Sequence, residues 1–234
     1  MYSELYHIFY DLLSLSRLYS YGSRVRALCS VYGYVPPSNE FLNLYAKLEG
    51  LAKKIDKLSE IPPSSSIGFI EKILREFDYS VILFDNLGMP EIMEIASRFE
   101  VLVAFFVINP HGDTAAFKTY FLVRYMRNLA EKYAMDFLNF PDKIIHKLSD
   151  HVDKCPDFSL NELIEYLYNN LTLRIIRIIS KVEDDKILLM ADHGYDIIKR
   201  GDNFSVCHGY ECLSAKGKLI FSKIAPIMLI RRAT

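Results

Sequence analysis

The stretch Lys186-Ile-Leu-Leu-Met-Ala-Asp-His-Gly-Tyr-Asp196 decides how the fold is interpreted. It begins with a short, almost entirely apolar run and continues with the polar turn Asp192-His193-Gly194. A run of this length without a polar face is typical of a strand in a parallel sheet that helices cover on both sides. In such sheets, ligands bind beyond the carboxyl ends of the strands. The stretch therefore predicts a buried strand that ends at a ligand-binding edge.

Four further apolar runs have the length and composition of strands. They lie at residues 80–84, 101–108, 135–140 and 224–230. Between them the sequence predicts a helix that begins near Pro90, a helix over 115–133, and a long helix over 160–182 with Ser159 as its N-cap. This alternation predicts an α/β fold in which a mostly parallel sheet is sandwiched by helices.

The first 75 residues have a different pattern. Apolar residues recur three and four positions apart, which predicts helices, and Gly33 and a proline pair interrupt them. Two prolines and three serines in residues 61–68 mark a second break. We therefore expect a helical N-terminal region, residues 1–75, and a sheet domain, residues 79–234.

The composition bounds the class of protein. The chain has 234 residues, of which 51% are apolar, so it has ample material for a buried core. A formal net charge of −1 gives no electrostatic reason to expect nucleic acid or an anionic membrane as partner. The longest apolar runs are far shorter than the roughly 18–20 residues of a membrane span. The first ten residues lack the basic start and apolar block of a signal peptide.

The four cysteines lie at positions 29, 155, 207 and 212. They form neither a Cys-x-x-Cys pair nor a dense framework, which favours a reduced, cytoplasmic protein with free thiols. Cys207 and Cys212 as zinc ligands are a less favoured alternative, because no second pair accompanies them.

Residues that can bind metals follow the apolar strands. They are Asp85, Asp142, Asp192 with His193 and, before the last strand, His208. Thr114 lies in the loop after residues 101–108. Carboxylates and imidazoles held by rigid strands suit zinc, manganese or similar ions. The sequence therefore predicts a metal site at this edge of the sheet.

Each of these residues also has an ordinary structural explanation. Asp85 alone suits an N-cap or a turn, and Asp142 with His146 suits an i,i+4 pair on a helix surface. Thr114 suits an N-cap of the following helix, and His208 alone decides nothing. The metal site is supported by the joint order of these residues and not by any one of them.

That order resembles the alkaline phosphatase superfamily, and in its compact form the PglZ domain, which is associated with bacterial and archaeal phage-defence systems. The resemblance covers residues 79–230, about two-thirds of the chain. Its most specific part is ILLMADHGYD, followed by His208-Gly209 and the closing SKIAPIMLI strand. The Asp142-x-x-x-His146 match is less specific.

The resemblance implies an alkaline-phosphatase-like core and a hydrolase site with two divalent metal ions, zinc or manganese. One ion would be held by Asp142, His146 and His208, and the other by Asp85, Asp192 and His193. Thr114 would be the nucleophile that attacks a phosphomonoester or phosphodiester substrate. Two cations would lower the pKa of the attacking hydroxyl and neutralise charge on phosphoryl oxygens.

The loop and helix around Thr114 leave several roles open. Asp113 and Thr119 are alternatives to it, and His111 and Asp113 suit either extra ligands or turn residues, of which turn residues are favoured. No arginine is obviously placed to bind phosphate, and Lys118 and Arg124 are the candidates.

Two other functions remain open. A non-catalytic PglZ-like subunit of a multi-protein defence or nucleic-acid-processing complex would use the tyrosine-rich N-terminal region to bind protein partners. The tyrosines concerned are Tyr2, Tyr6, Tyr10, Tyr19, Tyr21, Tyr32 and Tyr34. A helical cap that packs on its own sheet would explain them equally well. The third possibility is an unrelated α/β protein whose acidic strand ends are coincidental.

Overall fold

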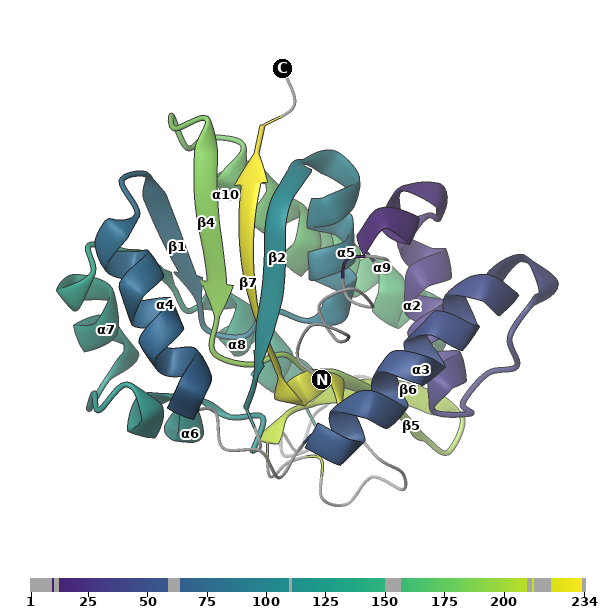
Figure 1. The fold of residues 1–234 in the computed structure, drawn as a ribbon. Helices are drawn as coiled ribbons and strands as arrows, with labels where there is room; N and C mark the ends of the chain where they lie inside the picture. The colour runs from purple at the N-terminus through teal and green to yellow at the C-terminus, as the bar shows by residue number, and fades with distance from the viewer. Residues whose placement is uncertain are drawn as a thin grey trace.

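The protein is built on a five-stranded sheet with helices on both faces (Figure 1). The computed structural model describes residues 10, 13–58, 64–109, 111–149, 157–209, 212 and 220–232. The sheet has the order β2-β7-β4-β1-β3. Its strands are β1 (Ser80–Phe84), β2 (Glu100–Ile108), β3 (Asp136–Leu138), β4 (Lys186–Ala191) and β7 (Ile224–Arg231). The α/β class and the expected strand positions are confirmed.

The sheet is mixed, which corrects the expected mostly parallel arrangement. β1 pairs in parallel with β3 and β4, whereas β7 is antiparallel to both β4 and β2. β1, β2, β3 and β4 therefore share one direction, and β7 runs against them. The reason is a hairpin that the sequence did not predict, β5 (Asp196–Arg200) with β6 (Asn203–Cys207). After the hairpin, the chain is still at the edge of the sheet where β4 ends. β7 therefore starts at that edge and runs antiparallel to β4.

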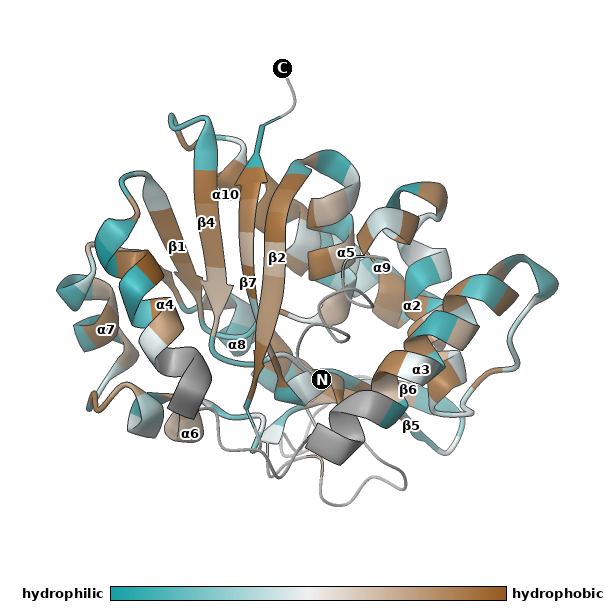
Figure 2. Ribbon diagram, in the orientation of Figure 1, coloured by the Kyte–Doolittle hydropathy of each residue, from teal (hydrophilic) through white to brown (hydrophobic). Residues whose placement is uncertain are grey.

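The strands are apolar throughout because both faces are covered. Val81 and Leu83 belong to one buried cluster, and Ile82 and Phe84 belong to the other. This is the alternation that a strand imposes on successive side chains. Figure 2 shows β2, β4 and β7 hydrophobic along most of their length.

One face of the sheet is covered by α4, α6 and α7, and the other by α2, α3, α5, α8, α9 and α10. The helices are α2 (Tyr21–Val31), α3 (Leu42–Leu58), α4 (Ser64–Glu76), α5 (Met89–Arg98), α6 (Thr114–Tyr120), α7 (Met126–Lys132), α8 (Phe140–Leu148), α9 (Leu160–Leu167) and α10 (Leu173–Ile179). Short helical turns occur at η1 (Ser16–Leu18), η2 (Asn39–Phe41) and η5 (Phe221–Lys223). None of the described helices is long and apolar enough to cross a membrane.

Three helices differ from expectation. The single helix predicted over 115–133 is two helices, α6 and α7, because Leu122 has a positive φ of 52° that no helix continues. The long helix predicted over 160–182 contains a π-helical segment, η3 (Tyr168–Thr172), and ends at Ile179. α4 begins at Ser64, inside the segment predicted as a break.

The N-terminal helices pack against the sheet domain. Val25 and Leu28 of α2 lie in the same buried cluster as Ile82 and Phe84 of β1. A domain boundary near residue 77 stays a prediction, because this cluster contains residues from both parts.

Several of the N-terminal tyrosines serve this packing. Tyr21 is buried and donates to Glu91 of α5, and Tyr32 donates to Asp196 of β5. Tyr19 and Tyr34 are partly buried against the same cluster. Of the others, Tyr10 is exposed, and Tyr2 and Tyr6 lie outside the described residues. The cap explanation therefore accounts for four of the tyrosines.

Cys207 and Cys212 form a disulfide, so the free-thiol interpretation is wrong for this pair. Their Cα atoms lie 5.3 Å apart, which is a normal bridging distance and which spacing alone did not reveal. Cys29 is a free, buried thiol, and Cys155 lies outside the described residues. A cytoplasmic location stays a prediction with less support than the sequence gave it.

Glu91 forms a buried polar junction between α5 and its neighbours. It accepts hydrogen bonds from the hydroxyls of Tyr21 at 3.2 Å, Thr172 at 2.9 Å and Tyr195 at 2.9 Å. Burial nevertheless raises the pKa of Glu91 to about 7, although these hydroxyls lower it. Burial of the carboxylate thus costs more than three neutral donors return.

This raised pKa predicts a pH dependence of stability. The folded state binds the Glu91 proton more tightly than the unfolded state, so this contribution is fully present below about pH 4.5 and is lost as the pH rises to about 7. Between pH 5 and pH 8, the free energy of unfolding of the wild type should fall by roughly 2 kcal/mol relative to that of Glu91→Gln. Glutamine keeps the size of the side chain but carries no charge, so the variant lacks this pH dependence. Urea unfolding at both pH values measures this. Glu131→Gln, at an exposed position, is the control, and parallel pH profiles for wild type and Glu91→Gln would contradict the prediction.

Candidate metal centre

The shared direction of β1 to β4 brings the polar side chains at their carboxyl ends together. Asp85 follows β1 directly, and Asp192 and His193 follow β4. Asp142 lies in the first turn of α8, immediately after β3, and its N–H donates to the carbonyl of Asp85 at 3.1 Å. His208 follows β6. Residues far apart in the sequence thus reach one edge.

The six candidate ligands form two groups in the described part of the chain. One consists of Asp142, His146 and His208, and the other of Asp85, Asp192 and His193. Within each group, one ligand atom from each residue lies within 4.8 Å of the others. The grouping is the one that the resemblance to the alkaline phosphatase superfamily implies.

The backbone fixes the orientation of Asp192. Its Oδ1 accepts hydrogen bonds from the N–H groups of Asn86 and His193, each at 3.0 Å. Its Oδ2 is buried and accepts no hydrogen bond from a described residue. One oxygen therefore anchors the side chain, and the other is left for a cation.

His193 is oriented in a comparable way. Its Nδ1 lies 2.9 Å from the carbonyl oxygen of Gly194, which is an acceptor, so Nδ1 carries the proton. This leaves the lone pair of the neutral ring on Nε2, which lies 3.7 Å from Asp192 Oδ2. A Cβ at Gly194 would lie 2.6 Å from the carbonyl oxygen of Phe221, so only glycine fits after this histidine.

The other group is built across two elements. Asp142 and His146 do form an i,i+4 pair on α8, with Oδ2 and Nε2 3.1 Å apart, and the imidazole of His146 is 48% exposed. His208 joins them from the hairpin, with Nε2 3.4 Å from Asp142 Oδ1. Its ring also stacks on that of His193, with centroids 4.7 Å apart, so the two groups adjoin. The disulfide between Cys207 and Cys212 closes a ring of chain around His208.

Burial and mutual repulsion raise the pKa values of the carboxyl groups. The pKa of Asp85 is raised to about 7, first by burial and then by the charges of Asp192 and Asp142. The pKa of Asp142 is raised chiefly by burial, although His146 and His193 lower it. Negative charge is therefore costly here unless a cation balances it.

The imidazoles respond to the same surroundings. The pKa of His208 is lowered to about 3, first by burial and then by the neighbouring imidazoles of His193 and His146. His208 is thus neutral at ordinary pH, the form in which imidazole binds a metal. Burial also lowers the pKa of His193, but Asp192 and the other nearby acceptors raise it above the ordinary value overall.

The residues fit two divalent cations. Asp142 Oδ1, Asp192 Oδ2 and the ring nitrogens of His208 are buried and have no well-formed hydrogen bond to the described residues. Buried polar atoms usually have partners, so a convergent set of these atoms is suited to binding a cation. The donors are three carboxylates and three imidazoles, the ligand types that suit zinc and manganese.

Thr114 faces this centre. Asp113 is the N-cap of α6, since its side chain accepts from the N–H of Ala116 at 2.9 Å. Thr114 is therefore free of the capping role that its sequence position allowed. Its hydroxyl donates to Asp85 Oδ1 at 3.2 Å and lies 3.3 Å from His193 Nε2. The hydroxyl of Thr119 instead donates to the carbonyl of Ala115 within the helix.

Two asparagines that the sequence did not single out organise the loops. Asn109 donates through Nδ2 to the carbonyls of Asp113 and Asp192, so it ties the loop after β2 to the end of β4. Asn86 has a positive φ of 73°, which turns its N–H toward Asp192. An asparagine directly after a strand is a weak signal for such a role.

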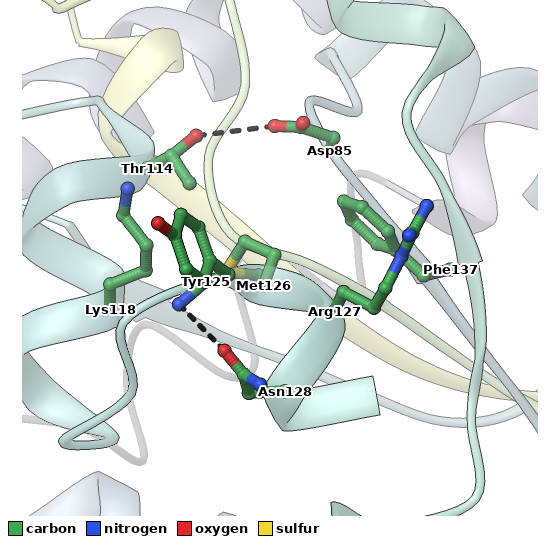
Figure 3. Close-up of a pocket in the computed structure, with 8 residues that line it drawn as sticks. All are labelled: Asp85, Thr114, Lys118, Tyr125, Met126, Arg127, Asn128 and Phe137. Carbon is green, nitrogen blue, oxygen red and sulfur yellow. Dashed lines mark hydrogen bonds between the residues drawn. The ribbon is translucent and has the colours of Figure 1, made fainter. Parts of the chain in front are cut away.

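A pocket of about 410 Å³ opens beside Thr114 and Asp85 (Figure 3). Lys118 lines it, as the sequence suggested, but Arg124 does not. The guanidinium of Arg124 lies over the ring of Tyr125, 5.2 Å from its centroid. Arg127 of α7 lines the pocket in its place. The candidate ligands thus adjoin a recess that carries two positively charged side chains.

Comparison with protein-family models and with curated proteins found no match to this chain. The sequence resemblance and the site geometry are therefore the available guides to function.

The geometry predicts two cation sites that can be removed separately. Titration of metal-free protein with zinc or manganese should give two equivalents by calorimetry or metal analysis. His208→Ala should remove the site at Asp142 and His146, and Asp192→Asn should remove the site at Asp85 and His193, each lowering the stoichiometry to one. Loss of a ligand should weaken that site by more than the ~10–100-fold typical of outer-shell changes.

His111→Ala is the control for these variants, because His111 is exposed, lies in the adjacent loop and belongs to neither group. A protein that takes up no metal, or whose stoichiometry is the same in His208→Ala and in His111→Ala, would contradict the assignment.

Proposed function

We propose that the protein is a metal-dependent phosphohydrolase, a phosphomonoesterase or phosphodiesterase, with Thr114 as its nucleophile. The observation that carries the proposal is the position of the Thr114 hydroxyl. It lies 3.2 Å from Asp85 Oδ1 and 3.3 Å from His193 Nε2, beside two members of one candidate ligand group and at the wall of the pocket. A threonine hydroxyl is a poor nucleophile unless its surroundings activate it, and this position supplies such surroundings.

The chemistry divides between the cations and the chain. Two bound cations would lower the pKa of the Thr114 hydroxyl and neutralise charge on the phosphoryl oxygens. The Asp85 carboxylate orients the hydroxyl by accepting its hydrogen bond. Thr114 Oγ1 then gives its proton to water and bonds to phosphorus as the bond to the ester oxygen breaks, and the ester oxygen takes up a proton from water and leaves as the alcohol. A second water attacks the phosphorus of the phosphothreonine, and one of its protons restores the Thr114 hydroxyl with release of phosphate, or of a phosphate monoester when the substrate is a diester.

Lys118 supports this reaction from the protein side. It lies one helical turn after Thr114 on α6, and both side chains line the same pocket (Figure 3). Its ammonium group would balance negative charge on the phosphoryl group during transfer. Membership in the alkaline phosphatase superfamily with a PglZ-like domain, and a role in phage defence, belong to this proposal and rest on the sequence resemblance.

The alternative of a non-catalytic interaction subunit has less support than the sequence gave it. Its argument was the surplus of tyrosines, and Tyr21 and Tyr32 are used inside the protein to bind Glu91 and Asp196. A scaffold also gives no reason for buried ligand atoms that converge without partners.

Replacement of the nucleophile tests the proposal. Zinc-, manganese- or magnesium-loaded protein should hydrolyse p-nitrophenyl phosphate or bis-p-nitrophenyl phosphate. Thr114→Val, which keeps the shape without the hydroxyl, should lose at least ~10³-fold in kcat, because the acceptor of the phosphoryl group is gone. The metal stoichiometry of the variant should be unchanged by calorimetry.

Thr119→Val is the matched control, since its hydroxyl bonds only within α6 among the described residues. Metal-loaded wild type that hydrolyses neither substrate would favour the scaffold. Thr114→Val with wild-type activity would instead exclude Thr114 as the nucleophile.

A further inference from the structure

The pocket beside Thr114 is larger than a phosphoryl group requires. Its volume is about 410 Å³, within the roughly 300–1,000 Å³ range of small-molecule sites. Asp85 and Thr114 occupy one side, and the rest is formed by α6, α7, the turn between them and β3. The excess space must accommodate the part of a substrate that is not transferred.

Two positively charged side chains line this space from different helices. Lys118 belongs to α6 and Arg127 to α7, and Figure 3 shows them on opposite sides of the pocket with the Tyr125 ring between them. Neither forms an ion pair with a described residue. Lys118 lies beside Thr114 and suits the transferred phosphoryl group. Arg127 is a second positively charged side chain, and binding of the transferred phosphoryl group alone does not explain its presence in the pocket.

The chemistry of Arg127 indicates what it binds. A guanidinium presents a planar fork of donors that fits the paired oxygens of a carboxylate or a phosphate. The side chain is exposed, and no described residue is a partner that a ligand would have to displace. The neighbouring Arg124 differs, because its guanidinium lies over the ring of Tyr125 and it does not line the pocket.

The walls of the pocket between Lys118 and Arg127 are aromatic and apolar. Tyr125, Met126 and Phe137 line the pocket, and Tyr125 is 55% exposed although its ring is large. The N–H of Tyr125 donates to Asn128 Oδ1 at 3.1 Å, which fixes the backbone from which the ring projects. An exposed aromatic ring in a recess suits stacking against a planar ring of a ligand.

We propose that this recess binds the organic group of the substrate, and that this group carries a ring and a second anionic group, a carboxylate or phosphate, held by Arg127. The substrate class is therefore a ring-containing phosphate ester with two separated anionic groups. The inference rests on the proposed hydrolase function, and Arg127 is a specificity residue within it.

The test compares matched substrates. The metal-loaded enzyme is assayed with phenyl phosphate, with 4-carboxyphenyl phosphate and with benzene-1,4-diol bisphosphate. We expect kcat/KM to be at least ~10-fold higher for one or both of the doubly anionic esters, since hydrogen bonds to charged groups stabilise by about 1.5–3 kcal/mol. The carboxylate and the bisphosphate arms show which anion is preferred.

Arg127→Ala should lower kcat/KM for the doubly anionic esters more than for phenyl phosphate, so that the preference falls to the ratio that the leaving groups alone produce. Arg124→Ala should retain the full preference and is the matched control, three residues earlier in the chain with the same change in charge. Arg127 is exposed, so its replacement should not disturb folding. An unchanged preference in Arg127→Ala, or equal loss toward all three substrates, would overturn the inference and leave the proposed hydrolase in place.

Binding separates the two proposals. Calorimetry of metal-loaded Thr114→Val with 4-carboxyphenyl phosphate and with phenyl phosphate measures recognition without turnover. Binding that favours the doubly anionic ester and is lost on adding Arg127→Ala supports the inference even if the wild type hydrolyses nothing. Equal affinity for both esters, or equal weakening by Arg127→Ala and Arg124→Ala, contradicts it.

Discussion

The hydrogen bonds around Asp192 tie together the ends of three strands. Its Oδ1 accepts from Asn86, just beyond β1, and from His193, and its own carbonyl accepts from Asn109, just beyond β2. The ends of β1, β2 and β4 are therefore held at fixed positions relative to one another. The positions of Asp85 and Thr114 depend on this junction, because Asp85 directly follows β1 and Thr114 follows the loop after β2.

This arrangement gathers negative charge in a place where burial opposes it. The pKa values of Asp85 and Asp142 are raised because burial disfavours their charged forms. A cation that binds buried carboxylates neutralises their charge. Because it binds only the folded state, it restores the stability that their burial removes. Glu91 shows the same cost away from the candidate centre, but three hydroxyls surround it, so it has the partners of a structural group.

Much of this could be predicted from the sequence, and the limits have physical causes. Strand positions followed from fully apolar runs, because burial on both faces requires them, and the grouping of the candidate ligands is the one that the resemblance implies. The reversed β7 and the Cys207–Cys212 disulfide did not, since each depends on where the β5–β6 hairpin lies relative to the sheet. The two-residue loop Gly201-Asp202, in which Gly201 has a positive φ of 56°, is a hairpin signal, but it does not show that position. Arg127 escaped notice because the break at Leu122 redirects α7, and an unbroken helix would have favoured Arg124. Asn109 acts through its side-chain amide on distant carbonyls, which local patterns do not encode.

The reversal of β7 has a practical consequence. The strand starts at the edge that carries Asp85 and Asp192 and runs away from it, so its last residues lie at the opposite edge of the sheet (Figure 1). An affinity tag or a surface attachment placed after Arg232 would leave the mouth of the pocket unobstructed. Immobilised protein can therefore be used to measure metal and ester binding without the support competing for the same face.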